Sequence, residues 1–161
     1  MSAKIQPCLW FNMNAEEAAQ FYAATFPNTR IDATHRAPGD YPAGTQGSVL
    51  TIEMTILGMP FLLLNAGSKF TFDEAISFQV LTEDQAETDR YWNAIVDSGG
   101  AESACGWCKD RFGLSWQITP RRLVQLVTAG GDTASRAFTA MMEMRKIDIA
   151  ALDRAVAGAA K

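Results

Sequence analysis

The sequence predicts an α+β protein made of two similar modules and a helical extension, each module being a strand and a helix followed by two or three further strands. Three observations carry this prediction. One order of strand, helix cap and aromatic pair occurs twice, 70 positions apart. Four strand-like runs alternate apolar and polar side chains, which is typical of a sheet with one exposed face. Residues 121–161 follow the second copy and carry apolar side chains at helical spacing.

The repeat is clearest where each helix should begin. A candidate cap, a glutamate three residues later and an aromatic pair recur in the same order, as in a capping box that opens a helix. The equivalent residues are Asn14 and Asp84, Glu17 and Glu87, and the pairs Phe21-Tyr22 and Tyr91-Trp92. We expect the first helix to end before Pro27 and the second at Gly99-Gly100.

Strand-like runs, and the breaks between them, indicate a single domain that is made of two modules. The runs are 5–11, 29–36, 48–57, 60–66, 76–80, 101–108 and 114–119. A Gly- and Pro-rich loop is expected at 37–47, and the boundaries are about 4–66 for module one, 67–74 for a linker, 75–120 for module two and 121–161 for the extension.

Two amphipathic helices are expected in the extension. Asp132 and Asp148 are their candidate caps. The apolar stripes are Ala134, Ala137, Phe138, Met141 and Met142 in the first helix, and Ile149, Leu152 and Val156 in the second. A methionine-rich stripe of this kind is typical of a core or a subunit interface.

Composition excludes several classes of protein. The chain has 161 residues, a net charge of −4 and 48% hydrophobic residues, which suits a globular domain and disfavours nucleic acid as a partner. The first residues lack the apolar core of a signal peptide, and no run of 18 apolar residues occurs, so no membrane partner is expected. We expect a cytoplasmic protein whose three cysteines stay reduced.

The alternating strands predict a face of hydroxyl and amide side chains. Ser77 and Gln79 alternate with apolar residues in one strand, and Ser115 and Gln117 do so in another. If this face is concave it forms a pocket, and otherwise it is the solvated side of the sheet. Glu53 is the acid on the equivalent face of the first module and is therefore our candidate general base.

Cys105-Gly106-Trp107-Cys108 has the spacing of a redox dithiol, but its context argues against redox chemistry. A reactive CxxC opens a helix, whereas this one follows the end of a helix and begins a predicted hairpin. On a strand, residues three apart point to opposite faces and lie too far apart for a disulfide. The same separation argues against a zinc site made by this pair with Cys8 and His35.

Four segments carry a resemblance to a known family: LWFNMNAEEAAQFYAATFPNTRI, GMPFLLLNAG, CGWCKDRFGLSWQITP and MMEMRKIDIAALDRA. They are similar to the PhnB-like branch of the vicinal oxygen chelate superfamily, which includes glyoxalases and bleomycin-resistance proteins and whose PhnB-like members often carry the label 3-demethylubiquinone-9 3-methyltransferase. The resemblance implies paired βαβββ modules, forming a curved mixed sheet with helices on its convex side. It also implies that Pro7 or a neighbour, Leu63 or Asn65, Ser77 and Gln117 stand where metal-dependent members place their ligands.

None of these positions supplies a histidine or a carboxylate, so we expect no metal and no cofactor. The methyltransferase label finds no support in a glycine-rich turn between a strand and a helix. We expect a metal-independent binding protein or enzyme that holds a small-molecule ligand in a polar concave pocket. The alternative is a structural or interaction module that acts as a homodimer. The expected ligand-binding residues are Trp10, Asn65, Ser77, Gln79, Trp107, Ser115 and Gln117.

Overall fold

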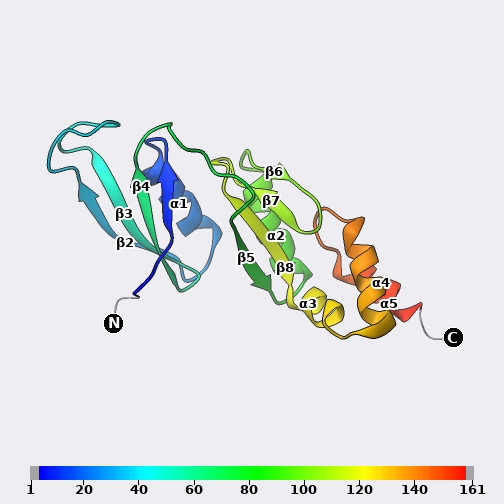
Figure 1. Ribbon diagram of the computed structural model, residues 1–161. Coiled ribbons are helices and arrows are strands. Elements are labelled where there is room, and N and C mark those ends of the chain that lie inside the picture. Colours follow the sequence, from blue (N-terminus) through cyan, green and yellow to red (C-terminus); the bar gives the residue numbers. More distant parts are fainter. Residues whose placement is uncertain (1–3, 159–161) are drawn as a thin grey trace. The chain divides into compact units, whose positions relative to one another are not determined.

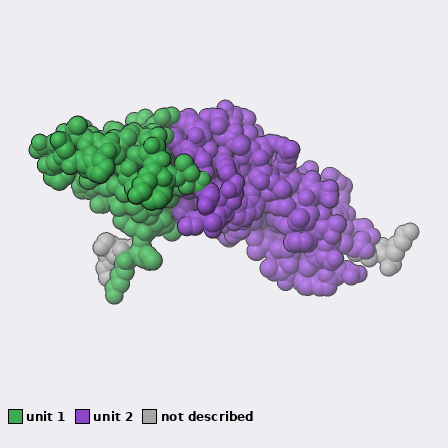
Figure 2. All heavy atoms as spheres, turned by 45° about the horizontal axis from the view of Figure 1, so that its top comes forward, with its two compact units in different colours: residues 1–72 green, residues 73–161 purple. Residues whose placement is uncertain are grey.

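The computed structural model describes residues 4–158 and divides the chain into two compact units. Unit 1 comprises residues 1–72 and unit 2 residues 73–161, coloured green and purple in Figure 2. Each unit has the element order βαβββ, so the predicted α+β fold of paired modules is confirmed (Figure 1). Among residues 4–158, no helix has both the length and the apolar character needed to cross a membrane.

Unit 1 is a four-stranded mixed sheet with one helix against one of its faces (Figure 1). The strand order is β1-β4-β3-β2, with β1 parallel to β4 and the other pairs antiparallel. A two-residue turn with positive φ at Leu57 and Gly58 joins β3 to β4, as a tight hairpin requires. The elements are β1 (Cys8–Phe11), α1 (Ala15–Thr25), β2 (Arg30–Arg36), β3 (Val49–Ile56) and β4 (Met59–Asn65).

Unit 2 repeats this topology and continues into a helical extension. Its strand order is β5-β8-β7-β6, again with the first and last strands of the unit paired in parallel. The starts of α1 and α2 are 70 residues apart, so the repeat in the sequence corresponds to a repeat in structure. The elements are β5 (Ser77–Thr82), α2 (Gln85–Val96), β6 (Ala101–Glu102), β7 (Trp107–Lys109), β8 (Ser115–Pro120), α3 (Arg121–Val127), α4 (Gly131–Met142) and α5 (Ile149–Ala157).

The two equivalent helices begin in different ways. Asp84 caps α2 as predicted, since its carboxylate accepts a hydrogen bond from the Glu87 N–H at 2.8 Å. Asn14 makes no such bond at the start of α1. There the Ala15 N–H donates instead to Asn65 Oδ1 at 3.0 Å, so a residue at the end of β4 satisfies the first turn of the helix.

The segment predicted as one strand at 101–108 is two short strands with a tight turn between them. The turn holds Cys105 and Gly106 at φ 58° and 83°, a left-handed conformation that no strand contains. A Cβ on Gly106 would lie 3.0 Å from the Ile147 side chain and 3.0 Å from the Ile118 carbonyl oxygen. Glycine is therefore required here by both backbone conformation and close packing.

The extension contains three helices rather than the two that the sequence predicted. Asp148 caps α5 as expected, accepting from the Ala151 N–H at 2.9 Å. Asp132 is not a cap, because α4 already begins at Gly131 and Asp132 lies in its first turn. Phe138 and Met142, expected in an apolar stripe, are 54% and 52% exposed. The buried cluster of the extension consists of Leu123, Leu126, Ala137, Ile147 and Leu152.

We predict that Asn65→Ala destabilises unit 1 by about 2 to 4 kcal/mol. The Asn65 side chain is 2% exposed and also donates to the Val49 carbonyl at 3.0 Å, so its removal leaves two buried backbone groups without partners. Urea unfolding followed by circular dichroism measures the loss. Asn14→Ala is the matched control and should change the free energy of unfolding by less than about 0.5 kcal/mol. Equal losses in the two variants would contradict this account of the helix start.

Candidate functional site

A cluster of polar side chains lies on one face of the unit 2 sheet, where β5 and β8 run in parallel. The register places Ser77 beside Ser115 and Gln79 beside Gln117. Gln117 Nε2 donates to Ser77 Oγ at 2.8 Å, and Gln79 Nε2 lies 3.5 Å from Gln117 Oε1. Because side chains alternate along a strand, the neighbouring residues of β8 face α2 instead. Three of the predicted ligand-binding residues thus form one hydrogen-bonded chain.

Trp107 joins this cluster from β7, where it pairs with Gln117 across the strands. Trp107, Gln79 and Gln117 form one side of a cleft of about 240 Å³. The residues lining the cleft are Gln79, Cys105, Trp107, Gln117, Thr119, Leu123, Val124, Val127 and Met141. No carboxylate, imidazole, ammonium or guanidinium group is among them, so the cleft provides hydrogen-bonding groups without a formal charge.

The apolar side of this cleft comes from α3 and α4, and the sequence analysis did not anticipate it. Leu123, Val124 and Val127 belong to α3, which starts directly after β8, and Met141 belongs to α4. The i, i+1 and i+4 spacing of the α3 residues is visible in the sequence as a short apolar stripe. The stripe was a detectable signal, but nothing in the sequence showed against which face of the sheet it packs.

Ser115 lies apart from the amide cluster although it occupies the same sheet face. It is 1% exposed, and its hydroxyl lies 3.5 Å from the Asp73 carbonyl oxygen. It lines a separate small cleft of about 200 Å³ together with Glu74, Trp107 and Lys109. The Lys109 ammonium is hydrogen-bonded to Glu74 and lowers the pKa of that carboxyl. Trp107 lines both clefts. Only the second cleft is lined by charged side chains.

The two candidate residues of unit 1 that point away from α1 are Glu53 and Trp10. Glu53 Oε1 lies 3.1 Å from His35 Nε2, and both side chains are about half exposed, at 51% and 53%. The pair sits on the open face of the sheet, across β2 and β3. At this exposure the pair is an ordinary surface contact.

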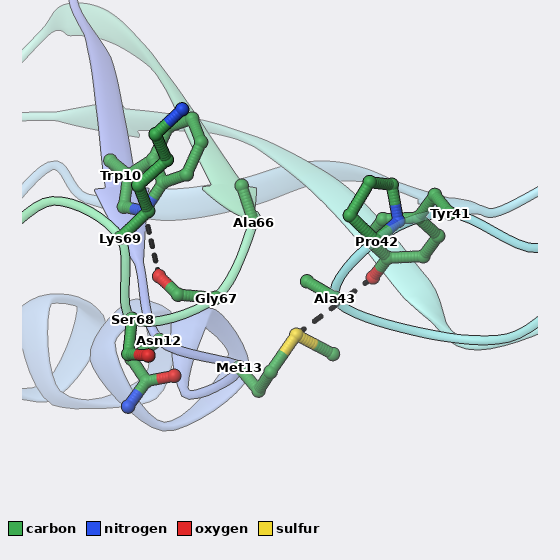
Figure 3. Close-up of a pocket in the computed structure, with 10 residues that line it drawn as sticks. All are labelled: Trp10, Asn12, Met13, Tyr41, Pro42, Ala43, Ala66, Gly67, Ser68 and Lys69. Carbon is green, nitrogen blue, oxygen red and sulfur yellow. Dashed lines mark hydrogen bonds between the residues drawn. The ribbon is translucent and has the colours of Figure 1, made fainter.

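Trp10 lines a cavity of about 620 Å³ in unit 1 (Figure 3). Its indole N–H donates to the Gly67 carbonyl at 2.7 Å and its ring meets Phe70 edge-on at 4.9 Å, so the side chain is held in place. Figure 3 shows Trp10 and Tyr41 on opposite sides of the opening, with Met13 below them. The lining residues are Trp10, Asn12, Met13, Tyr41, Pro42, Ala43, Ala66, Gly67, Ser68 and Lys69.

Asn65 is not on the open face of the unit 1 sheet, contrary to its expected place among the ligand-binding residues. It pairs in register with buried Phe11, so its side chain lies on the α1 side. Its amide oxygen accepts from the Ala15 N–H, and its amide nitrogen donates to the Val49 carbonyl. The residue is structural because it connects β4, β3 and the start of α1.

Cys105 and Cys108 form no disulfide, and they are joined by a turn rather than by the continuous strand predicted from the sequence. Cys105 lies in the turn, with its Sγ 3.7 Å from Met142 Sδ, whereas Cys108 lies on β7 and is 1% exposed. Burial raises the pKa of the Cys108 thiol to about 12, and the nearby Asp110 and Glu102 carboxylates add to this rise. Only a thiolate attacks a disulfide or binds a metal, so Cys108 is chemically inert at neutral pH.

A metal ion finds no suitable set of ligands in the described part of the chain. Within residues 4–158, no three His, Cys, Asp or Glu side chains lie close enough together to hold one. The amide and hydroxyl groups of the unit 2 cleft do not replace them, because catalytic zinc, iron or nickel sites use imidazole, thiolate and carboxylate ligands. The residues of the polar face therefore do not fit the metal that the superfamily resemblance implies.

A family model and one solved structure carry the same family description, and a second solved structure shares the fold. The protein-family model described as 3-demethylubiquinone-9 3-methyltransferase matches residues 3–119. A solved structure described as a putative 3-demethylubiquinone-9 3-methyltransferase, PhnB protein, from Bacillus cereus is 30% identical with a TM-score of 0.65, and the match covers 73% of this chain and 99% of that one. Protein PA1353 from Pseudomonas aeruginosa is 19% identical with a TM-score of 0.62, over 74% of this chain and 98% of its own. No curated protein matches the sequence.

We predict that iodoacetamide modifies Cys108 in the native protein far more slowly than in urea. At pH 8, a pKa of about 12 leaves roughly a thousandfold less thiolate than a thiol at 9.0 would have, and the thiolate fraction increases only as the pH rises toward 12. Peptide mass spectrometry over time measures the rate at each cysteine. Diamide treatment should likewise give no disulfide between Cys105 and Cys108, and a native protein that forms this bond would contradict the prediction.

Proposed function

Because the chain belongs to the 3-demethylubiquinone-9 3-methyltransferase family, within the glyoxalase and bleomycin-resistance superfamily, we propose that it binds a small neutral molecule through hydrogen bonds in the unit 2 cleft. Gln79 and Gln117 are the main binding groups, Ser77 orients Gln117, and Trp107 provides a flat apolar contact. Neither a metal ion nor a cofactor takes part in this binding.

The observation that carries the proposal is the chain of hydrogen bonds from Ser77 through Gln117 to Gln79 at the edge of an uncharged cleft. A glutamine side chain offers two donors and one acceptor oxygen, so two adjacent glutamines can meet a ligand that both donates and accepts. Ser77 takes up one Gln117 N–H and thereby restricts the rotation of that amide. Such convergent polar groups beside apolar walls are typical of small-molecule sites.

The methyl transfer in the family's description is not part of the proposal. A Rossmann-type cofactor site would place a glycine-rich turn between a strand and the helix that follows it. The turn from β5 to α2 contains Glu83 and Asp84 instead, and the pairs Gly99-Gly100 and Gly130-Gly131 lie at helix ends. The role of Glu53 as a general base stays a prediction from the sequence, since it belongs to unit 1 and to no part of this cleft.

The unit 1 cavity favours a second, different ligand. We also propose that Trp10 contributes there to a site for a planar molecule with one negative charge. Trp10 and Tyr41 provide aromatic walls, and Lys69 is the one charged side chain among the residues that line the cavity. The cavity volume of about 620 Å³ lies within the range usual for ligand sites.

We predict that butanamide binds saturably in the unit 2 cleft and that Gln117→Leu reduces its affinity about five- to thirtyfold. The substitution keeps the side-chain volume but removes both hydrogen-bonding groups, which contribute on the order of 1 to 2 kcal/mol in total. Proton–nitrogen NMR titration that follows the side-chain amide signals of Gln79 and Gln117 measures the affinity. Gln125→Leu is the matched control, because Gln125 is exposed on α3 and does not line the cleft.

Three comparisons make this titration decisive. Butanoate and butylammonium should bind more weakly than butanamide, because the cleft cannot neutralise either charge. Addition of EDTA should leave the affinity unchanged, and a loss of binding in EDTA would refute metal independence. If no amide gives a saturable change and light scattering shows a dimer, the homodimeric interaction module is the better interpretation of the fold.

For the unit 1 cavity, we predict that benzoate binds about two- to fivefold more tightly than benzamide, the gain expected from one exposed ion pair. The indole N–H signal of Trp10 in NMR spectra reports binding. Lys69→Gln should remove this preference, while Lys4→Gln, which alters an exposed lysine outside the cavity, should keep it. Equal binding of the two ligands by the unmodified protein would show that Lys69 does not select for charge.

A further inference from the structure

The cleft on unit 2 has two chemically different halves that come from different parts of the chain. Its polar half lies on the sheet and consists of Gln79, Gln117 and Thr119. Its apolar half consists of Leu123, Val124, Val127 and Met141, all on α3 or α4. We call these four residues the helical wall. A ligand that fills the cleft must satisfy hydrogen-bonding groups at one end and contact hydrocarbon at the other.

The helical wall lies outside the part of the chain that matches the family. The family match ends at residue 119, one residue before the end of β8, whereas the wall begins at Leu123. The Bacillus cereus structure is covered over 99% of its own length by a match that includes only 73% of this chain. The polar half of the cleft thus lies within the residues that the family model matches, and the apolar half lies beyond them, although Met141 opens the segment MMEMRKIDIAALDRA, which itself resembles the PhnB-like branch.

The extension is fixed to the family fold by backbone hydrogen bonds. The N–H groups of Cys105 and Gly106 donate to the carbonyls of Met144 and Arg145, each at 2.7 Å. The Gln85 side chain holds the next part of the segment, donating to the Ile147 carbonyl at 3.0 Å and accepting from the Ile149 N–H at 2.9 Å. Both ends of the segment 144–149 are therefore attached to the βαβββ part of unit 2.

Side chains reinforce this attachment. Ile147 is fully buried and packs against Gly106, where a Cβ would lie 3.0 Å from it. Lys146 forms an ion pair with Asp89 at 2.8 Å, and the hydrogen bond from Lys146 lowers the pKa of that carboxyl. Arg145 reaches Glu102 at 3.2 Å. The wall is consequently in place before a ligand arrives, and no ordering of α3 and α4 opposes binding.

The size and charge of the cleft define the ligand further. At about 240 Å³ the cleft is smaller than the roughly 300 to 1,000 Å³ typical of sites for drug-sized molecules. None of its lining side chains is a carboxylate, an imidazole, an ammonium or a guanidinium group. A small uncharged ligand with a hydrogen-bonding head and a short hydrocarbon tail matches these limits.

We infer that the C-terminal helices are the specificity element of the unit 2 cleft, selecting a neutral amphipathic ligand whose tail lies against the helical wall. This inference rests on the proposed function of the same cleft. The polar head is read by Gln79 and Gln117 on the sheet. Val127 and Met141 contact the tail and so limit its length and shape. Both residues also pack against the buried cluster of the extension.

A homologous series of primary amides, from propanamide to hexanamide, tests the inference. In the unmodified protein each added methylene should raise the affinity about fourfold until the cleft is filled, because the tail leaves water for the helical wall. NMR titration measures each dissociation constant, with the glutamine side-chain amides reporting on the head and the Met141 methyl group on the tail. Propanamide should perturb the amides and leave the Met141 methyl signal almost unchanged.

Substitutions in the wall should flatten this dependence on chain length. Val127→Ala with Met141→Ala should reduce the gain per methylene to twofold or less and leave propanamide affinity within a factor of two. Val124→Ser is the second variant, since Val124 is 36% exposed and its change does not disturb the buried cluster. Phe138→Ala is the matched control: Phe138 lies on α4, is 54% exposed and does not line the cleft.

The possible failures are distinguishable. If no amide of any length perturbs Gln79 and Gln117, the proposed function of the cleft is wrong. If short amides bind but affinity does not rise with chain length, the binding proposal stands and the role of the helical wall is overturned. The same conclusion follows if the wall variants keep the full gain per methylene while remaining folded by circular dichroism.

Discussion

The parallel pairing of β5 with β8 is the constraint on which the candidate site depends. It places Gln79 beside Gln117, and it sets which residues of both strands face α2. A shift of the register by one residue would turn Phe78 and Trp116 onto the open face and bury the amides. The tight packing of Trp116, 1% exposed and hydrogen-bonded to Asp110 at 2.9 Å, opposes any such shift. Core packing on one face thus determines the chemistry presented on the other.

Alternation and local caps predicted much of the fold because they act over a few residues. The alternation in 114–119 located β8, and Asp84 and Asp148 correctly located two helix starts. Where distant segments take part, the sequence offered less. Asn14 was expected to cap α1. In the structure Asn65 accepts the hydrogen bond from the Ala15 N–H instead, across 50 residues of chain. The same tertiary bond places the Asn65 side chain on the α1 side of the sheet, which no local pattern could indicate.

The candidate site was partly predictable for the same reason. Side-chain alternation identified Ser77, Gln79 and Gln117 as neighbours on one face, since strands paired in register bring equivalent positions together. The apolar half of the cleft depends on how the chain turns after Pro120 and on where Met141 returns, and these are properties of tertiary packing. Glu53 and Trp10 have the right residue types for a site, but they belong to unit 1 and have partners of their own there.

The attachment of the segment 144–149 also determines when unit 2 is completed during synthesis. Gln85, at the start of α2, bonds to Ile147 across 62 residues of chain, so this contact cannot form until Ile147 has left the ribosome. Contacts between such distant positions form late, because closing a long loop costs entropy before any packing is gained. The βαβββ core of unit 2 can therefore assemble first, with its turn at Gly106 uncovered. The segment 144–149 then covers this turn, and α3, α4 and α5 are added to a core that already has its fold.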